Sequence, residues 1–130
     1  KEELKDAVKL ETDVLRTLYF ENKGNKFEEK KLPTEAQFAP VYAIAAMDID
    51  KDGDSDVVMG GNESNVRVRI GKSDANRGLI LLNDGKGNFS SLPQSRAGLN
   101  VVGDMRSIEY VGDEFVFGIN DAKIKTFTLH

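Results

Sequence analysis

Apolar residues fall in short runs along most of the chain, and glycine, asparagine or charged residues close each run. The runs are about five residues long and rich in β-branched and aromatic side chains, a pattern typical of β-strands. Glycine is frequent from Gly53 onward, as expected where tight turns join strands. The pattern predicts an all-β fold with antiparallel strands at residues 15–21, 26–31, 41–47, 55–60, 79–83, 88–91, 106–110, 114–119 and 124–129.

Two segments depart from this pattern. Leu4, Ala7 and Val8 recur at helical spacing among good helix formers. Residues 1–14 are therefore interpreted as a lead-in with one short, poorly buried helix. Residues 62–77 are polar and show little periodicity, which predicts a long loop of the kind that often carries function.

Three sequence features occur twice in the same order. They are an apolar strand followed by asparagine, glycine and phenylalanine, then a Leu-Pro pair, and a VMGGN-like strand end. The matched pairs are residues 18–27 with 79–89, 32–33 with 92–93, and 58–62 with 116–120. Unrelated hairpins with similar turns could produce one match, but three in the same order favour a repeat unit of about 60 residues.

The repeat divides one domain into parts. A chain of 130 residues has room for a single ordinary domain with its own core. Within residues 15–130 we expect a partial unit at 15–40, a complete unit at 41–93 and a last unit at 94–130.

Composition excludes several classes of function. The net charge of −4 arises from mixed signs, so no basic field is present to attract nucleic acid. No apolar run is long enough for membrane insertion, and the chain begins without a signal-peptide pattern or an initiator methionine. The absence of cysteine excludes disulfides and thiolate metal sites. The only histidine, His130, is interpreted as part of a frayed chain end.

An acidic loop is the strongest chemical signal in the chain. Aspartates alternate with other residues at Asp48, Asp50, Asp52, Asp54 and Asp56, and such a concentration of like charge is unfavourable without a cation. In loops of the form D-x-D-x-D-G, carboxylates at positions one, three and five face one centre. The glycine at six allows a sharp turn, position seven offers a backbone carbonyl, and position nine completes the shell. Oxygen ligands in a flexible loop predict Ca²⁺ over Mg²⁺ or Zn²⁺; the alternative is a solvated acidic turn.

The context of the loop differs from that of an EF-hand. An EF-hand requires a bidentate glutamate at position twelve, which here is Met59. It also requires flanking helices, whereas residues 41–47 and 57–59 are apolar runs typical of buried strands. The loop is therefore expected to join two neighbouring strands.

These residues resemble the FG-GAP and VCBS-type repeats of β-propeller proteins. The resemblance rests on D-x-D-x-D-G-x-x-D at 48–56, the exit DVVMGGN at 56–62 and the turn NDGKGNF at 83–89. The segment 71–75 is similar to a loop in bacterial members of the cartilage-acidic-protein type. The resemblance covers residues 15–130 and implies antiparallel blades, with calcium bound between the first two strands of a blade.

The chain also departs from that family. It holds about two units and a leading half, so the resemblance implies either an incomplete propeller or an open sandwich of blades. Residues 111–114 stand where a second calcium loop would lie and are too short and too poor in carboxylates to bind, which predicts one strong site.

The preferred interpretation is a noncatalytic module whose calcium is structural. Calcium sites of extracellular modules are weak, so the module is expected outside the cell, at the cell surface or in the periplasm, with a protein or glycan as partner. An incomplete propeller would also leave strand edges free for self-association.

The alternative is part of a propeller-based carbohydrate-active enzyme using Asp74, Asp84 or Glu109. No pattern in the sequence fixes a pair of these carboxylates across a cleft, and no nucleophile motif is present. A calcium sensor ranks last, because a loop between strands offers no bistable helix pair.

Overall fold

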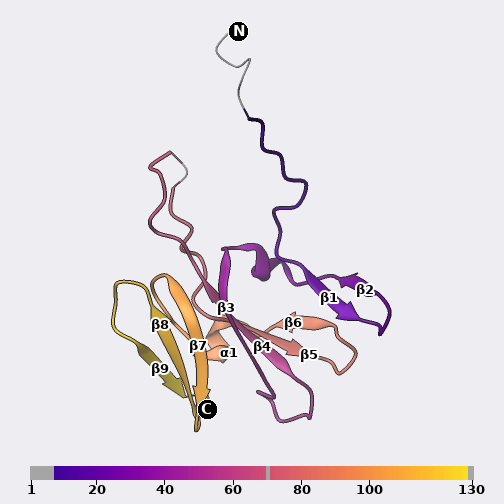
Figure 1. Ribbon diagram of the computed structural model, residues 1–130. Coiled ribbons are helices and arrows are strands. Elements are labelled where there is room, and N and C mark those ends of the chain that lie inside the picture. The colour runs from indigo at the N-terminus through magenta and orange to yellow at the C-terminus, as the bar shows by residue number, and fades with distance from the viewer. Residues whose placement is uncertain (1–7, 70, 129–130) are drawn as a thin grey trace.

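The computed structural model describes residues 8–69 and 71–128, which form antiparallel β-sheets (Figure 1). Nine strands are present in this part of the chain. They are β1 (Tyr19–Asn22), β2 (Phe27–Lys30), β3 (Val41–Met47), β4 (Asp56–Gly61), β5 (Leu79–Asn83), β6 (Phe89–Ser91), β7 (Met105–Val111), β8 (Glu114–Ile119) and β9 (Lys125–Thr128). The predicted all-β class with antiparallel pairing is confirmed.

Most strands lie within one or two residues of their predicted positions. The strands β3, β5 and β8 have the predicted bounds. The largest difference is at β1, whose ladder with β2 starts at Tyr19 and not at residue 15. Leu15 is 90% exposed, so its apolar character reports no burial. The predicted strand at 124–129 corresponds to β9, and residue 129 lies outside the described residues.

The helix predicted for the lead-in is wrong where the structure describes it. Residues 8–14 form no helical turn, and residues 1–7 lie outside the described residues. Val8 and Leu10 are 84% and 89% exposed, so this segment has no apolar surface to pack on. A helix of this length is marginal in water without such packing.

Two short helices follow the two Leu-Pro pairs. The 3₁₀ helix η1 spans Thr34–Gln37, and α1 spans Gln94–Ala97. A proline stands immediately before each helix, where its fixed φ and missing N–H are tolerated. Both helices are followed by a seven-residue strand, β3 in one case and β7 in the other.

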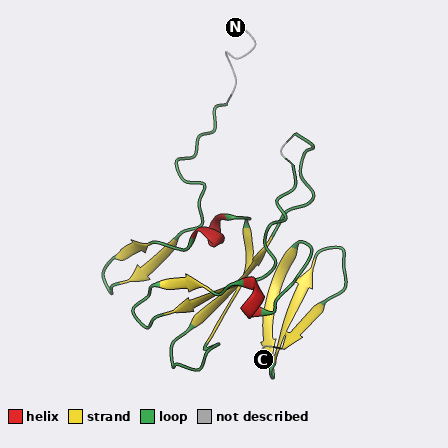
Figure 2. Cartoon of the chain, turned by 180° about the vertical axis from the view of Figure 1, so that it is seen from behind, coloured by secondary structure: helices red, strands yellow, loops and turns green. Residues whose placement is uncertain are grey.

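The sheet β3-β4-β5-β6 is the middle layer of three (Figure 2). Side chains alternate between its two faces, as the pleat requires. Val58 and Ile80 pack into the core shared with the β7-β8-β9 sheet, and Met59 and Leu81 pack on the other face with Ala36 of η1. Burial on both faces explains why β4 and β5 are continuous apolar runs rather than alternating ones.

The larger core lies between the middle sheet and the β7-β8-β9 sheet. Phe115 and Phe117 of β8 are fully buried there, together with Leu99 and Val101 from the connection that follows α1. On the opposite face, the ring of Tyr19 contacts that of Phe89 edge-on at 5.2 Å, which holds the β1–β2 hairpin against the middle sheet.

The β3–β4 and β7–β8 hairpins share one irregularity. The ladder of the first shifts at Tyr42, next to Gly60, and that of the second shifts at Arg106, next to Gly118. Each shift adds one residue to the longer strand, as in a β-bulge. The two extra residues meet, because the Arg106 guanidinium lies 4.2 Å from the centroid of the Tyr42 ring.

Arg106 also binds the chain that leaves β4. Its Nη1 donates to the carbonyl of Asn62 at 2.9 Å, and its Nη2 donates to Glu63 Oε2 at 3.1 Å. The Tyr42 hydroxyl donates to the same carboxylate oxygen at 3.1 Å. We refer to Tyr42, Asn62, Glu63 and Arg106 as the Arg106 joint, which connects the middle sheet to the last sheet.

No sheet closes on itself within residues 8–69 and 71–128. Residues 62–77, apart from Ile70, form the predicted loop. Its ends at Asn62 and Asn76 are buried, and the part between them extends away from the sheets (Figures 1 and 2). A search of the described helices for one long and apolar enough to cross a membrane finds none.

Candidate metal centre

The acidic loop joins β3 to β4, at the lower end of the molecule as seen in Figure 1. Met47 and Asp56 are paired across the two strands, so the hairpin closes directly at the loop. Within the loop Lys51 and Gly53 adopt left-handed conformations, with φ of 64° and 97°. Glycine adopts such a φ without strain, and these two residues fold the loop back on itself.

Three of the five predicted carboxylates converge. Asp48, Asp50 and Asp56 each place one oxygen so that the three atoms lie within 4.8 Å of one another. Oxygens on opposite sides of a calcium ion, each about 2.4 Å from it, are about 4.8 Å apart, so this spacing suits a shared ion. Asp48 and Asp50 are exposed, whereas Asp56 is fully buried at the base of the loop.

Backbone N–H groups fix the position of Asp56. Its Oδ2 accepts from the Ile49 N–H at 2.9 Å, and its Oδ1 accepts from the Asn83 N–H at 2.8 Å. The first bond ties the carboxylate to its own loop, and the second ties it to the end of β5. A buried carboxylate with both oxygens bonded is a rigid anchor for the site.

Asp48 is held in a similar way by the loop. Its Oδ1 accepts from the Asp52 N–H at 3.1 Å, and its Oδ2 accepts from the Gly53 N–H at 3.0 Å. These bonds shape the turn around the carboxylate, as aspartates commonly do in turns.

The charge of the cluster is not compensated by a nearby side chain. Within the described part of the chain, no lysine or arginine forms an ion pair with Asp48, Asp50 or Asp56. Desolvation and then the charge of Asp52 raise the pKa of Asp50 above its ordinary value. A carboxylate whose ionised form is disfavoured by its neighbours is stabilised by a bound cation.

Asp52 and Asp54 are not part of the converging group. The Asp52 carboxylate accepts from the Asp54 N–H at 3.0 Å. The Asp54 side chain lies beside Gly85 in the β5–β6 turn, where a Cβ would collide with it. In the D-x-D-x-D-G pattern, the residue at position seven, here Asp54, binds through its backbone carbonyl. The pattern therefore does not require the Asp54 side chain to face the converging carboxylates.

The structure adds Asn83 to the site, a residue that sequence reasoning treated only as part of a turn. Besides its N–H bond to Asp56, its Nδ2 donates to the Ser55 carbonyl at 3.2 Å, and its Oδ1 accepts from the Gly87 N–H. Asn83 therefore joins the β3–β4 loop to the β5–β6 turn. The only signal for it was its place beside the Asp-Gly turn.

The corresponding position in the last sheet is a tight turn. Val111 and Glu114 are paired, so two residues, Gly112 and Asp113, connect β7 to β8. Gly112 has a φ of 64°, which suits a two-residue hairpin.

Over the described residues, these observations define an all-β chain with antiparallel sheets and a carboxylate cluster at one hairpin end. Comparison with known proteins finds no matching family model, no matching curated protein and no matching solved structure.

Proposed function

We propose that the chain is a noncatalytic calcium-binding module in which the ion stabilises the β3–β4 loop. The observation that carries this proposal is the convergence of Asp48, Asp50 and Asp56, with no basic side chain paired to them among the described residues. Carboxylate oxygens are the ligands that hard cations prefer. A loop that can adjust its carbonyls suits the six to eight ligands of calcium better than the strict octahedron of magnesium.

The proposed role of the ion is structural. A ligand present at 100 times its dissociation constant stabilises the folded state by about 2.7 kcal/mol, a large share of the stability of a typical domain. Weak calcium sites fill only where calcium is abundant, so we place the module outside the cell, at its surface or in the periplasm. Its partner in this proposal is an extracellular protein or glycan.

We further propose that the sheets are blade-like units of the FG-GAP or VCBS type. The support is the recurrence of one order of elements: a hairpin, a Leu-Pro pair, a short helix and a bulged seven-residue strand. In this arrangement β1–β2 is the outer half of one blade, β3–β6 is a complete blade, and β7–β9 belongs to the next.

Thermal unfolding in EDTA and in millimolar calcium tests the ion. With calcium near 100 times its dissociation constant, we expect the melting temperature to rise by on the order of 10 °C. Asp50→Asn keeps the shape of the side chain and removes one anionic ligand, so it should abolish most of the rise. Asp113→Asn, in the β7–β8 turn, is the matched control and should respond to calcium as the native chain does.

Two results would contradict the proposal. If calcium leaves the melting temperature of the native chain unchanged, the loop is only a turn. If Mg²⁺ or Zn²⁺ at equal concentration stabilises the chain more than Ca²⁺, the site exists but its metal is misassigned.

A further inference from the structure

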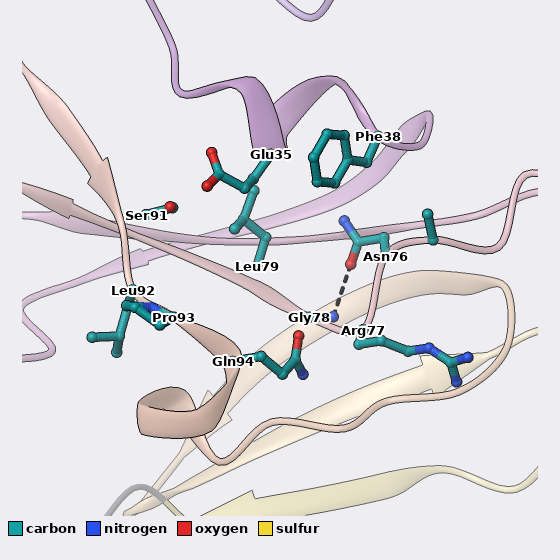
Figure 3. A pocket seen from close by; sticks show the side chains of 11 residues that line it. Glu35, Phe38, Asn76, Arg77, Gly78, Leu79, Ser91, Leu92, Pro93 and Gln94 are labelled. Carbon is teal, nitrogen blue, oxygen red and sulfur yellow. Dashed lines mark hydrogen bonds between the residues drawn. The ribbon is translucent and has the colours of Figure 1, made fainter.

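A cavity of about 330 Å³ lies at the other end of β5 from the acidic loop (Figure 3). It is bounded by η1, by the chain entering β5 and by the chain leaving β6. This volume is at the low end of the range for small-molecule sites, roughly 300 to 1,000 Å³. The polar side chains that line it are Glu35, Asn76, Arg77, Ser91 and Gln94.

Asn76 presents a hydrogen-bond donor to this cavity. Asn76 is only 7% exposed, and its side-chain Oδ1 accepts from the Gly78 N–H at 2.8 Å. An N–H can bond only to the oxygen of the amide, so the amide orientation is fixed and Nδ2 faces the cavity (Figure 3). This Nδ2 donates to no other residue in the described part of the chain. It is accessible from the cavity and not sealed in the core, so a ligand there can accept a hydrogen bond from it.

The backbone of Asn76 holds the amide in place. Its N–H donates to Asn62 Oδ1 at 2.9 Å, and its carbonyl accepts from Asn62 Nδ2 at 2.7 Å. The next carbonyl, that of Arg77, accepts from the Val101 N–H at 2.9 Å. Gly78 then packs so closely on Leu99 that a Cβ would be 3.2 Å from its nearest carbon. The donor is therefore fixed before any ligand arrives, which reduces the entropic cost of binding.

Gln94 presents the complementary group. Its Nε2 donates to the carbonyl of Leu99, so its Oε1 is left to accept, and it points toward the cavity in Figure 3. The Glu35 carboxylate adds a charged acceptor on the opposite wall. Its own backbone N–H and then the Ser91 hydroxyl hold the pKa of Glu35 below the ordinary value. The carboxylate is therefore ionised at neutral pH.

Apolar side chains complete the walls. Phe38 is 55% exposed and its ring stands beside Asn76 (Figure 3). Leu79, Leu92 and Pro93 also line the cavity. A ligand in this cavity can therefore form hydrogen bonds with Asn76, Glu35 and Gln94 while it packs on apolar side chains such as Phe38.

We propose that this cavity binds one residue of a neutral saccharide. A sugar hydroxyl accepts from Asn76 Nδ2 and donates to the Glu35 carboxylate or to Gln94 Oε1, so one ring satisfies both kinds of group. The C–H face of a sugar ring is apolar and packs on the ring of Phe38. The inference deepens the proposed function by naming the class of partner, and it rests on that function only for the role of a binding module.

Charged ligands fit the cavity less well. The Glu35 carboxylate attracts an ammonium group, but such a group has no acceptor for the Asn76 donor, and the guanidinium of Arg77, another lining residue, opposes its charge. An anion would approach the ionised Glu35 carboxylate. A neutral ligand with hydroxyl groups avoids both penalties.

Titration with simple sugars tests the proposal. The probes are the methyl glycosides of glucose, galactose, mannose, xylose and N-acetylglucosamine, added up to tens of millimolar to the ¹⁵N-labelled chain in saturating calcium. We expect at least one probe to shift the side-chain NH₂ signals of Asn76 and the backbone signals of Gly78 and Gln94. If no probe shifts these signals, the proposal is overturned.

Two exposed residues provide variants that should fold normally. We expect Glu35→Gln to weaken binding of the active probe by about tenfold, since a charged acceptor is lost. Phe38→Ala should weaken it by about fivefold through lost stacking. Their matched controls are Glu109→Gln and Phe27→Ala, which alter an exposed glutamate and an exposed phenylalanine elsewhere. Equal affinity in Glu35→Gln, Phe38→Ala and the native chain would overturn the assignment of these walls.

Two further arms separate the possible failures. In the first, methylammonium and a sulfated methyl glycoside are titrated in place of the neutral probes. If either binds more tightly than every neutral methyl glycoside, the ligand class is cationic or anionic and the saccharide proposal is overturned. The same titration in EDTA separates the two sites. Calcium stabilisation without sugar binding removes the saccharide proposal alone, and sugar binding without calcium stabilisation removes the ion alone.

Discussion

Gly61, the last residue of β4, lies against the backbone of Pro40, which precedes β3. A Cβ at this position would overlap the carbonyl oxygen of Pro40 and lie 2.8 Å from its carbonyl carbon. The obstacle is backbone that is also held by the bond from the Asn62 N–H to the Pro40 carbonyl, so it cannot move away. At Gly118, in the other hairpin, the Cβ would instead meet the Ser107 hydroxyl, which can rotate.

This difference predicts unequal effects of the same substitution. We expect Gly61→Ala to lower the free energy of unfolding by about 3 kcal/mol or more, and Gly118→Ala to lower it by about 1 kcal/mol or less. Denaturant unfolding of the two variants and the native chain measures both values. Equal losses in the two variants would mean that the Pro40 backbone moves aside as easily as the Ser107 side chain.

At the residue scale, spacing alone predicted five ligand carboxylates in the acidic loop, because ligands within one loop are local. Three of them, Asp48, Asp50 and Asp56, converge in the structure, but the residues that support them were not predicted. Asn83 lies 27 residues beyond Asp56, and its N–H bond depends on how β4 and β5 pair. Asn76 was one polar residue of a loop in the sequence, and its donor role follows from a contact with Asn62 that no local pattern records.

Among elements, the β5–β6 turn depends on ionised Asp84. Its Oδ2 accepts from Asn88 Nδ2 at 2.8 Å, and its Oδ1 accepts from the N–H groups of Asn88 and Lys86 at 3.0 and 2.9 Å. The bond from the Asn88 side chain, first among several, lowers the pKa of Asp84 to about 2. The folded pKa is below the unfolded value, so this contribution to stability is present above pH 3.8 and is lost as the pH falls through about 2.

Asn88→Ala removes the largest cause of that shift. We expect the Asp84 pKa in the variant to rise toward 3.8, which an NMR titration of the carboxyl group measures. Unfolding between pH 4 and pH 2 should then depend less on pH than in the native chain. Asn25→Ala, in the β1–β2 turn, is the control and should leave the Asp84 titration unchanged. An unshifted titration in Asn88→Ala would contradict this account.

Strands were predictable where burial and turn chemistry agree. In β4 and β5 the apolar runs are continuous because both faces are covered. One tight turn stands immediately before β8 and another immediately after β5, so turn residues mark those two strand ends. The described part of the lead-in, residues 8–14, forms no helical turn although Val8 fits a helical spacing. Helical spacing predicts a helix only where a surface exists to bury it, and such a surface is a property of the fold.

At the scale of the whole molecule, the Arg106 joint connects two sheets that share a core. Arg106 donates to Asn62 and Glu63 at the end of β4 and makes a cation–π contact with Tyr42, while its side chain is 32% exposed. We expect Arg106→Met to lower the free energy of unfolding by about 1 to 2 kcal/mol, and Arg106→Lys to recover only part of it, because lysine lacks the planar fork.

Chemical denaturation in calcium measures these losses. Arg96→Met alters an exposed arginine of α1 and should change the free energy by less than about 0.5 kcal/mol. If Arg106→Met is as stable as Arg96→Met, the joint contributes nothing and the apolar core alone holds the two sheets together.

The order of the three sheets was the part of the fold least accessible from sequence. The recurring sequence features predicted which elements recur but not that Tyr42 and Arg106 would meet. Nothing in the local sequence of β3 or β7 distinguishes these two residues from other polar or aromatic strand residues. Contacts of this kind depend on the angle between sheets, which the pattern of a single strand does not encode.

The acidic loop and the cavity lie at opposite ends of β5, which spans Leu79–Asn83. At about 3.3 Å per residue, a strand of this length separates the two ends by about 13 Å. Substitutions at that distance act nearly independently. If the cavity binds a ligand and the loop binds an ion as proposed, substitutions in the walls of the cavity change its specificity without weakening the ion site at the far end of β5.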